Sequence, residues 1–188
     1  MRKGAVLSIL LLACWSTVYA AEECWTLEFE SETPRRLVIA NPLGEDEVYW
    51  YVLYKVTNKT KAERFFIPDI RIETETKRVY KDSLYGGLES AVEKKEGKKF
   101  LNFAEMIGKV KPGEIKSGIA LFSQIDPAAD EICLVVLGIT NEFKIERTEE
   151  GKKICRHRAL IVTYKRPGDE HYPASKRVYF YSRTWAWR

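Results

Sequence analysis

The sequence has few of the side chains from which catalytic and metal sites are usually built. Its only histidines are His157 and His171, and neither stands at a spacing typical of zinc ligands. The four cysteines form no Cys-x-x-Cys pair, which removes support for thioredoxin-like chemistry and haem attachment. Gly-x-Ser-x-Gly and a glycine-rich phosphate loop are also missing. We therefore predict that the chain is not an enzyme and has no catalytic residue, metal ligand or cofactor.

The chain also lacks an excess of charge of either sign. It has 31 basic and 27 acidic side chains, a formal net charge of +4, and two of the basic residues, Arg2 and Lys3, lie in the leader described below. This balance gives no reason to expect nucleic acid as the partner. The acids are too many and too scattered to select a catalytic pair, so a hydrolase of unrecognised type stays an alternative. Asp126 and Asp130 flank a loop that offers fewer oxygens than calcium takes.

Long apolar runs are absent after the first residues. The chain starts Met-Arg-Lys, continues with apolar residues 4–13 and reaches small residues at Val18-Tyr19-Ala20. This pattern predicts a signal peptide over residues 1–20, cleaved during export to a periplasmic or other extracytoplasmic compartment. No later stretch is long enough to span a membrane. Leu11-Leu12-Ala13-Cys14 also resembles a bacterial lipobox, so lipid anchoring at Cys14 is the alternative.

Three cysteines remain after the predicted cleavage, namely Cys24, Cys133 and Cys155. Export would permit one disulfide. A bond to Cys24 would tie down a terminal strand, whereas Cys133 and Cys155 lie on consecutive predicted strands. Spacing alone leaves the connectivity open and leaves one thiol over.

Most of the chain shows the alternation of side chains that is typical of β-strands. Residues 47–57 alternate β-branched and aromatic side chains on both faces, as a strand in the middle of a sheet does. Eight or nine such stretches with turns between them predict an all-β fold, an immunoglobulin-like β-sandwich forming a single domain over residues 21–188. Helical spacing of apolar residues predicts two short helices, at residues 88–95 and within 100–107, inserted between strands.

The C-terminal residues 176–188 interleave basic and aromatic side chains. Alternation in a last strand places one set on a single face, with an arginine between rings. We predict this set as a protein interface: Tyr179, Tyr181, Arg183, Trp185 and Trp187. The same residues fit a ladder that only stabilises the sheet. They also fit a stacking platform for single-stranded nucleic acid or for sugar rings.

Several spaced motifs together resemble a family of exported bacterial proteins. The motifs are residues 49–58, Lys111-Pro112-Gly113-Glu114 before residues 118–122, residues 166–170, and Trp185-Ala186-Trp187-Arg188. The chain is similar in these to uncharacterised exported single-domain proteins of planctomycete-type genomes. It also resembles a non-catalytic subunit of an anammox nitrite oxidoreductase assembly. The resemblance implies export, one domain and a role in organising enzyme complexes, and it does not extend to the cysteines.

Together these patterns predict a non-catalytic exported protein-binding domain, acting as a scaffold or accessory subunit. Its partner would be another protein or a second copy of the chain. A carbohydrate- or cell-wall-binding module is the alternative that uses the same tryptophans.

Overall fold

A computed structural model describes residues 23–166 and 178–188. The predicted signal peptide, Cys14 and His171 lie outside these residues. Within them the chain is mainly antiparallel β-structure with two helices, which confirms the predicted predominance of strands. None of the helices in this described part has the length and apolar character needed to cross a bilayer.

The first sheet is built around the strand whose pattern is strongest in the sequence. β3 (Asp46–Thr57) pairs with β8 (Ile115–Phe122) along one side, and with β1 (Glu28–Ser31) and β2 (Arg35–Ala40) along the other. Val52 on one face of β3 is fully buried, and Tyr51 on the other face is 1% exposed. Burial on both faces explains why nearly every position of this strand is apolar, and it confirms the predicted central strand.

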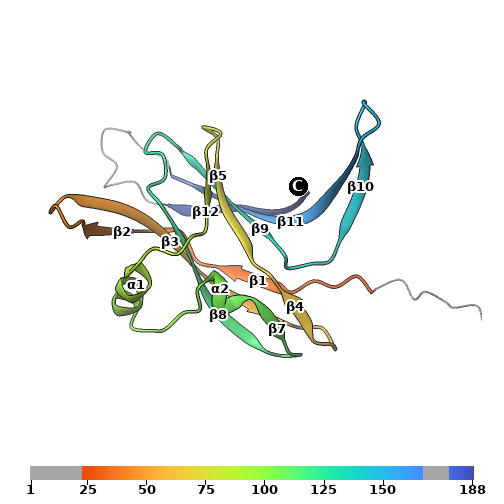
Figure 1. Ribbon diagram of the computed structural model, residues 1–188, viewed down its shortest axis with the longest axis horizontal. Coiled ribbons are helices and arrows are strands. Elements are labelled where there is room, and N and C mark those ends of the chain that lie inside the picture. Colours follow the sequence, from red (N-terminus) through yellow and green to blue (C-terminus); the bar gives the residue numbers. More distant parts are fainter. Residues whose placement is uncertain (1–22, 167–177) are drawn as a thin grey trace, which may run out of the picture.

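The second sheet runs in the order β10, β11, β9, β5, β6, with β12 added to β11. Figure 1 labels all of these strands except β6. Its strands are β5 (Asp69–Thr74), β6 (Val79–Lys81), β9 (Glu131–Leu137), β10 (Phe143–Arg147), β11 (Lys153–Lys165) and β12 (Tyr179–Trp187). β4 (Arg64–Phe66) and β7 (Gly108–Val110) form a separate short pair.

The two sheets share one hydrophobic core. Its residues include Trp50, Val52, Tyr54 and Val56 from β3, and Leu134, Val136, Leu160 and Val162 from β9 and β11. Each fully buried apolar side chain of this size contributes about 1.5–3 kcal/mol. A second cluster packs helix α1 (Leu88–Glu96) onto the opposite face of the first sheet through Leu88 and Val92. The first sheet is therefore covered on both faces.

Both predicted helices are present, and the second is shorter than predicted. α1 matches the predicted 88–95 closely and ends at Gly97, whose left-handed φ of 67° closes the helix. The second helix, α2 (Phe103–Met106), is a single turn capped by reciprocal bonds between Asn102 and Glu105. It is shorter than the predicted 100–107 because Leu101 bridges to Gly118 and Gly108 begins β7.

The disulfide that export would permit is not formed among the three cysteines in the described part of the chain, which are all free thiols. Cys133 lies opposite Thr163, whereas Cys155 lies opposite Ile145. Thr163 and Cys155 are eight positions apart on β11, or about 26 Å at the rise of a strand. Cys133 and Cys155 therefore occupy different ends of the sheet.

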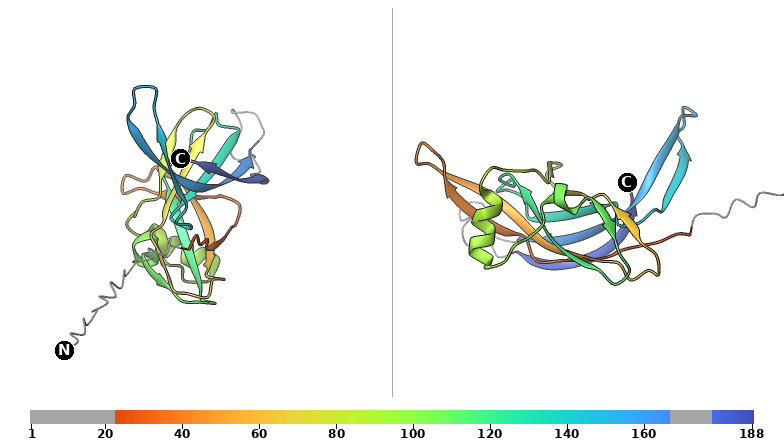
Figure 2. Two further views of the ribbon diagram at one scale, coloured as in Figure 1. Left: turned by 90° about the vertical axis from the view of Figure 1, so that its right-hand side faces the viewer. Right: turned by 60° about the horizontal axis from the view of Figure 1, so that its bottom comes forward.

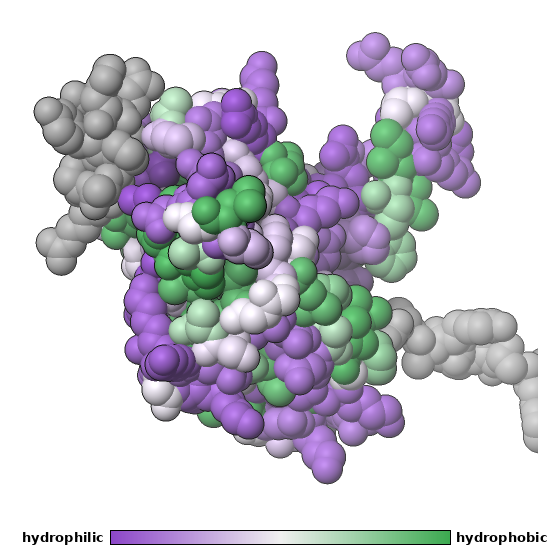
Figure 3. Space-filling view, turned by 60° about the vertical axis from the view of Figure 1, so that its left-hand side comes forward, coloured by the Kyte–Doolittle hydropathy of each residue, from purple (hydrophilic) through white to green (hydrophobic). Residues whose placement is uncertain are grey.

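The start of β11 leaves the body of the molecule as a two-stranded arm. Residues 153–157 pair with β10, and the hairpin projects away from both sheets, as Figure 2 shows. Phe143 is 60% exposed and Ile145 is 62% exposed on the arm. In Figure 3 the arm carries hydrophobic side chains beneath a hydrophilic tip.

Candidate interaction surface

β12 is the edge strand of the second sheet, and β11 is its only strand partner within the described residues. The hydrogen bonds define which backbone groups face the edge. His157 and Arg188 exchange both of their N–H···O=C bonds, of 2.8 and 2.9 Å. Because these groups alternate in direction along an antiparallel strand, those of Arg183, Trp185 and Trp187 point to the open edge.

A β-bulge divides the side chains that alternation alone places on one face. Ser182 pairs with Thr163 and Phe180 pairs with Tyr164, so Tyr181 is an extra residue without an opposite partner. On one side of the bulge, Arg183, Trp185 and Trp187 still alternate together. Tyr179 lies opposite Lys165 on the other face of the sheet. The prediction of a single five-residue face is therefore wrong.

The face toward the first sheet carries Arg183, Trp185 and Trp187, opposite Val162, Leu160 and Arg158. Leu160 and Val162 belong to the core, at 3% and 1% exposed, but each of the two tryptophans is 37% exposed. The inner face of β12 therefore extends the core to the protein surface. No described residue fully covers the two tryptophans there.

Cations from neighbouring strands lie over these tryptophans. The Arg158 guanidinium is 5.0 Å from the Trp185 ring, and the Lys144 ammonium is 5.0 Å from the Trp187 ring. Arg158 donates to both carboxylate oxygens of Glu142, at 2.5 and 2.6 Å, which lowers the pKa of that acid. The rings are thus held in place before any partner arrives.

Arg183 itself does not lie in the predicted position between rings, since the cations over the rings come from β10 and β11. It lines a groove of about 300 Å³ between β12 and β1, together with Trp185 and the buried Leu27, Phe29 and Leu160. No acid forms an ion pair with Arg183 within the described residues. The groove therefore combines apolar walls with Arg183 and with the ion pair of Glu28 and Lys59.

The outer face of β12 carries the tyrosines. Tyr179 is 47% exposed and Tyr181 is 61% exposed. Lys165 lies 4.9 Å from the Tyr181 ring and is paired with Glu131 at 2.7 Å. That bond raises the pKa of Lys165 and lowers that of Glu131. On the C-terminal side of the bulge, the outer face of β12 carries the small side chains of Ser182, Thr184 and Ala186.

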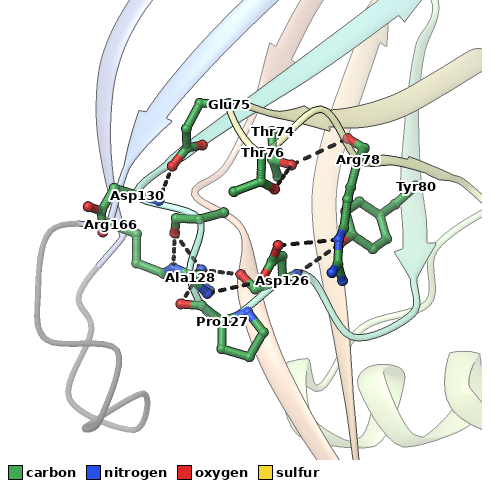
Figure 4. Close-up of polar contacts among 11 residues, drawn as sticks. Thr74, Glu75, Thr76, Arg78, Tyr80, Asp126, Pro127, Ala128, Asp130 and Arg166 are labelled. Atoms are coloured by element: carbon green, nitrogen blue, oxygen red, sulfur yellow. Dashed lines mark hydrogen bonds and ion pairs between the residues drawn. The ribbon is translucent and has the colours of Figure 1, made fainter.

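The loop between Asp126 and Asp130 is organised by a side chain that the sequence analysis does not identify. Arg166 is 3% exposed and donates to the carbonyl oxygens of Asp126, Pro127 and Ala129, as Figure 4 shows. Its guanidinium also lies 5.5 Å from the buried Trp50 ring. The only sequence signal was its position at the end of a strong strand.

The carboxylates of this loop bind protein groups. Asp126 accepts from the backbone N–H of Ala128 at 3.0 Å and pairs with Arg78 at 3.3 Å, which together with other hydrogen bonds lowers its pKa. Among the described residues, neither Asp126 nor Asp130 belongs to a group of three or more possible metal ligands. The loop is therefore a structural clamp around Arg166.

A strongly perturbed acid lies where the chain crosses between the sheets. Asp82 accepts from the backbone N–H of Leu121 at 2.9 Å, and its own N–H donates to Ile70. Burial raises its pKa from 3.8 to about 7, although the bonds from Leu121 and Ser83 act in the opposite direction. This site is separate from β12.

No protein-family model, curated protein or solved structure matches the chain.

Proposed function

We propose that the chain is a non-catalytic exported domain of the immunoglobulin-like β-sandwich type, which binds another protein chain along β12 as a scaffold or accessory subunit. The observation that carries the proposal is the open edge of β12. Its outward backbone groups at Arg183, Trp185 and Trp187 stand beside exposed rings on the same residues. Strand addition supplies affinity through the backbone, while the side chains select the partner.

The side-chain composition of the edge supports a protein partner over a sugar. Tryptophan and arginine are the residues that most often dominate protein interfaces. Cations already lie over Trp185 and Trp187, at the faces on which a sugar ring would stack. A strand at the edge leaves those cation contacts in place.

The experiment compares two proline variants in the chain purified, with a tag, from its own source. Arg183→Pro removes an N–H from the open edge of β12 and leaves the bonds to β11 intact. Val38→Pro is the matched control. The N–H of Asn41 donates to the carbonyl oxygen of Glu45, just before β3, so alternation along β2 turns the N–H of Val38 to the open edge. Native mass spectrometry reports the assemblies that each variant retains.

We expect the wild type and Val38→Pro to be recovered in an assembly heavier than one chain, and Arg183→Pro to be recovered as a monomer. Circular dichroism checks that all three fold. Recovery of only monomeric wild type would overturn the proposal, and so would an assembly that tolerates Arg183→Pro.

A further inference from the structure

The open edge of β12 has the geometry to pair antiparallel with the same edge of a second copy. Between Ser182 and Arg188 the strand is regular, because the bulge ends at Ser182. The middle of this segment is Trp185. In an antiparallel arrangement with the two-fold axis at Trp185, Arg183 of one copy lies opposite Trp187 of the other, and each Trp185 lies opposite its symmetry mate. All of these positions have backbone groups that point outward.

We propose, building on the proposed function, that the chain bound along β12 is a second copy, paired antiparallel about Trp185 so that the second sheet continues across a two-fold axis. A two-fold interface uses the same patch on both subunits and must therefore be self-complementary. The alternation of a cation and rings around Trp185 meets that condition.

The charges of the inner face favour this register. Lys144 is paired with Glu146 at 2.5 Å and Arg158 is paired with Glu142, whereas Arg183 has no acid partner in the described part. Pairing about Trp185 places each Arg183 opposite Trp187, whose ring already has Lys144 at 5.0 Å, and keeps the two Arg183 side chains apart. A shift of the axis to Arg183 would place the two guanidinium groups opposite each other, which is unfavourable.

The side chains on the outer face of β12 are small enough to allow this pairing. There, Thr184 of one copy lies opposite Ala186 of the other, and Ser182 lies opposite Arg188. Thr184 and Ala186 bond to β11, so across the new interface they form a non-hydrogen-bonded pair with Cα atoms about 4.5 Å apart. The inner face would cover Trp185 and Trp187, each 37% exposed in one copy.

A register-specific disulfide tests this arrangement with purified chain alone. In a background carrying Cys24→Ser and Cys155→Ser, which removes the exposed thiols, one chain carries Thr184→Cys and a differently tagged chain carries Ala186→Cys. Oxidised glutathione accepts the two electrons and is released as two thiols. The Cα separation at this pair lies within the range of disulfides.

We expect the mixture to give a disulfide-linked dimer that contains both tags, and either variant alone to give at least tenfold less. Sedimentation of the unoxidised chain should show a concentration-dependent dimer for the wild type and Val38→Pro, and a monomer for Arg183→Pro.

A wild-type monomer at every concentration, or equal crosslinking of one variant with itself, would overturn the self-pairing. If that monomer is still found in a heavier assembly from the native source, and Arg183→Pro abolishes the assembly, the proposed function stands with a different protein on β12. Loss of both results would overturn both proposals.

Discussion

The first sheet has a protected edge along β1 and β2, whereas the second sheet has a less protected edge along β12. The edge formed by β1 and β2 is interrupted by Pro34, and Lys95 of α1 donates to the carbonyl oxygen of Arg36 at 3.1 Å. Glu96 binds Arg35 at 2.6 Å and Tyr51 at 2.6 Å above the same edge. Proline, lysine and a covering element are the devices that protect edges from pairing with another chain.

The edge of β12 has no proline, lysine or covering element among the described residues, and the protective features it does have are the bulge at Tyr181 and the inward-pointing Arg183. Its nine-residue strand presents rings on both faces, and its bulge lies near one end, so that the segment from Arg183 to Trp187 stays regular. A long apolar edge of this kind is an aggregation risk unless a partner covers it. This contrast is what the proposed binding of a partner along β12 would account for.

The largest expected difference between the two regions concerns their tryptophans. Trp50 is 3% exposed in the shared core and lies under Arg166, whereas Trp185 is 37% exposed. We expect Trp50→Ala to lower the free energy of unfolding by about 3–5 kcal/mol, because it leaves a cavity in the core. Trp185→Ala should lower it by about 1 kcal/mol or less in the monomer. Urea denaturation of both variants measures the difference, and equal losses would contradict the contrast.

The second prediction concerns pH and the crossing between the sheets at Asp82. Because its folded pKa of about 7 exceeds its ordinary 3.8, the folded state holds a proton that the unfolded state releases. The stability that Asp82 contributes should therefore be complete below pH 4 and should fall as pH rises toward 7, by at most about 4 kcal/mol. Glu96 and Glu131, whose pKa values are lowered, act in the opposite direction only at more acidic pH.

Asp82→Asn should abolish that decline, because it keeps an acceptor for the N–H of Leu121 without a charge. Denaturation midpoints of both proteins between pH 5 and about 8 provide the measurement. Asp69→Asn, at an exposed acid of β5, is the control and should keep the wild-type slope. An unchanged decline in Asp82→Asn would show that another group governs the dependence.

A smaller effect is expected at the protected edge itself. Glu96→Gln weakens the bonds to Arg35 and Tyr51, and we expect it to lower the free energy of unfolding by about 1 kcal/mol. Burial and the bond to Glu96 raise the pKa of Tyr51 to about 12. The variant should therefore also lower the phenol pKa, which ultraviolet titration detects. Glu149→Gln, in the exposed hairpin tip, should change neither quantity.

Sequence patterns predicted the elements better than they predicted the surface. Alternation located β3 and β8, and apolar spacing located α1, because each of these signals comes from burial along one segment. The bulge at Tyr181 has no comparable signal, since it depends on the register against β11. The role of Arg166 depends on carbonyl groups some 40 positions away. Free thiols at Cys133 and Cys155 likewise follow from register, which spacing does not reveal.

The smallest expected effect tests the division of β12 by its bulge. Tyr179 and Tyr181 lie on the outer face, away from the groove, whereas Trp187 lies on the inner face and opposite Arg183 in the proposed pairing. We expect Trp187→Ala to weaken self-association at least tenfold, while Tyr179→Ala and Tyr181→Ala change it by less than about twofold, a difference under about 0.4 kcal/mol. Sedimentation equilibrium of the three variants measures this. Equal weakening by all three would restore the single aromatic face that alternation predicts and remove the bulge from the explanation.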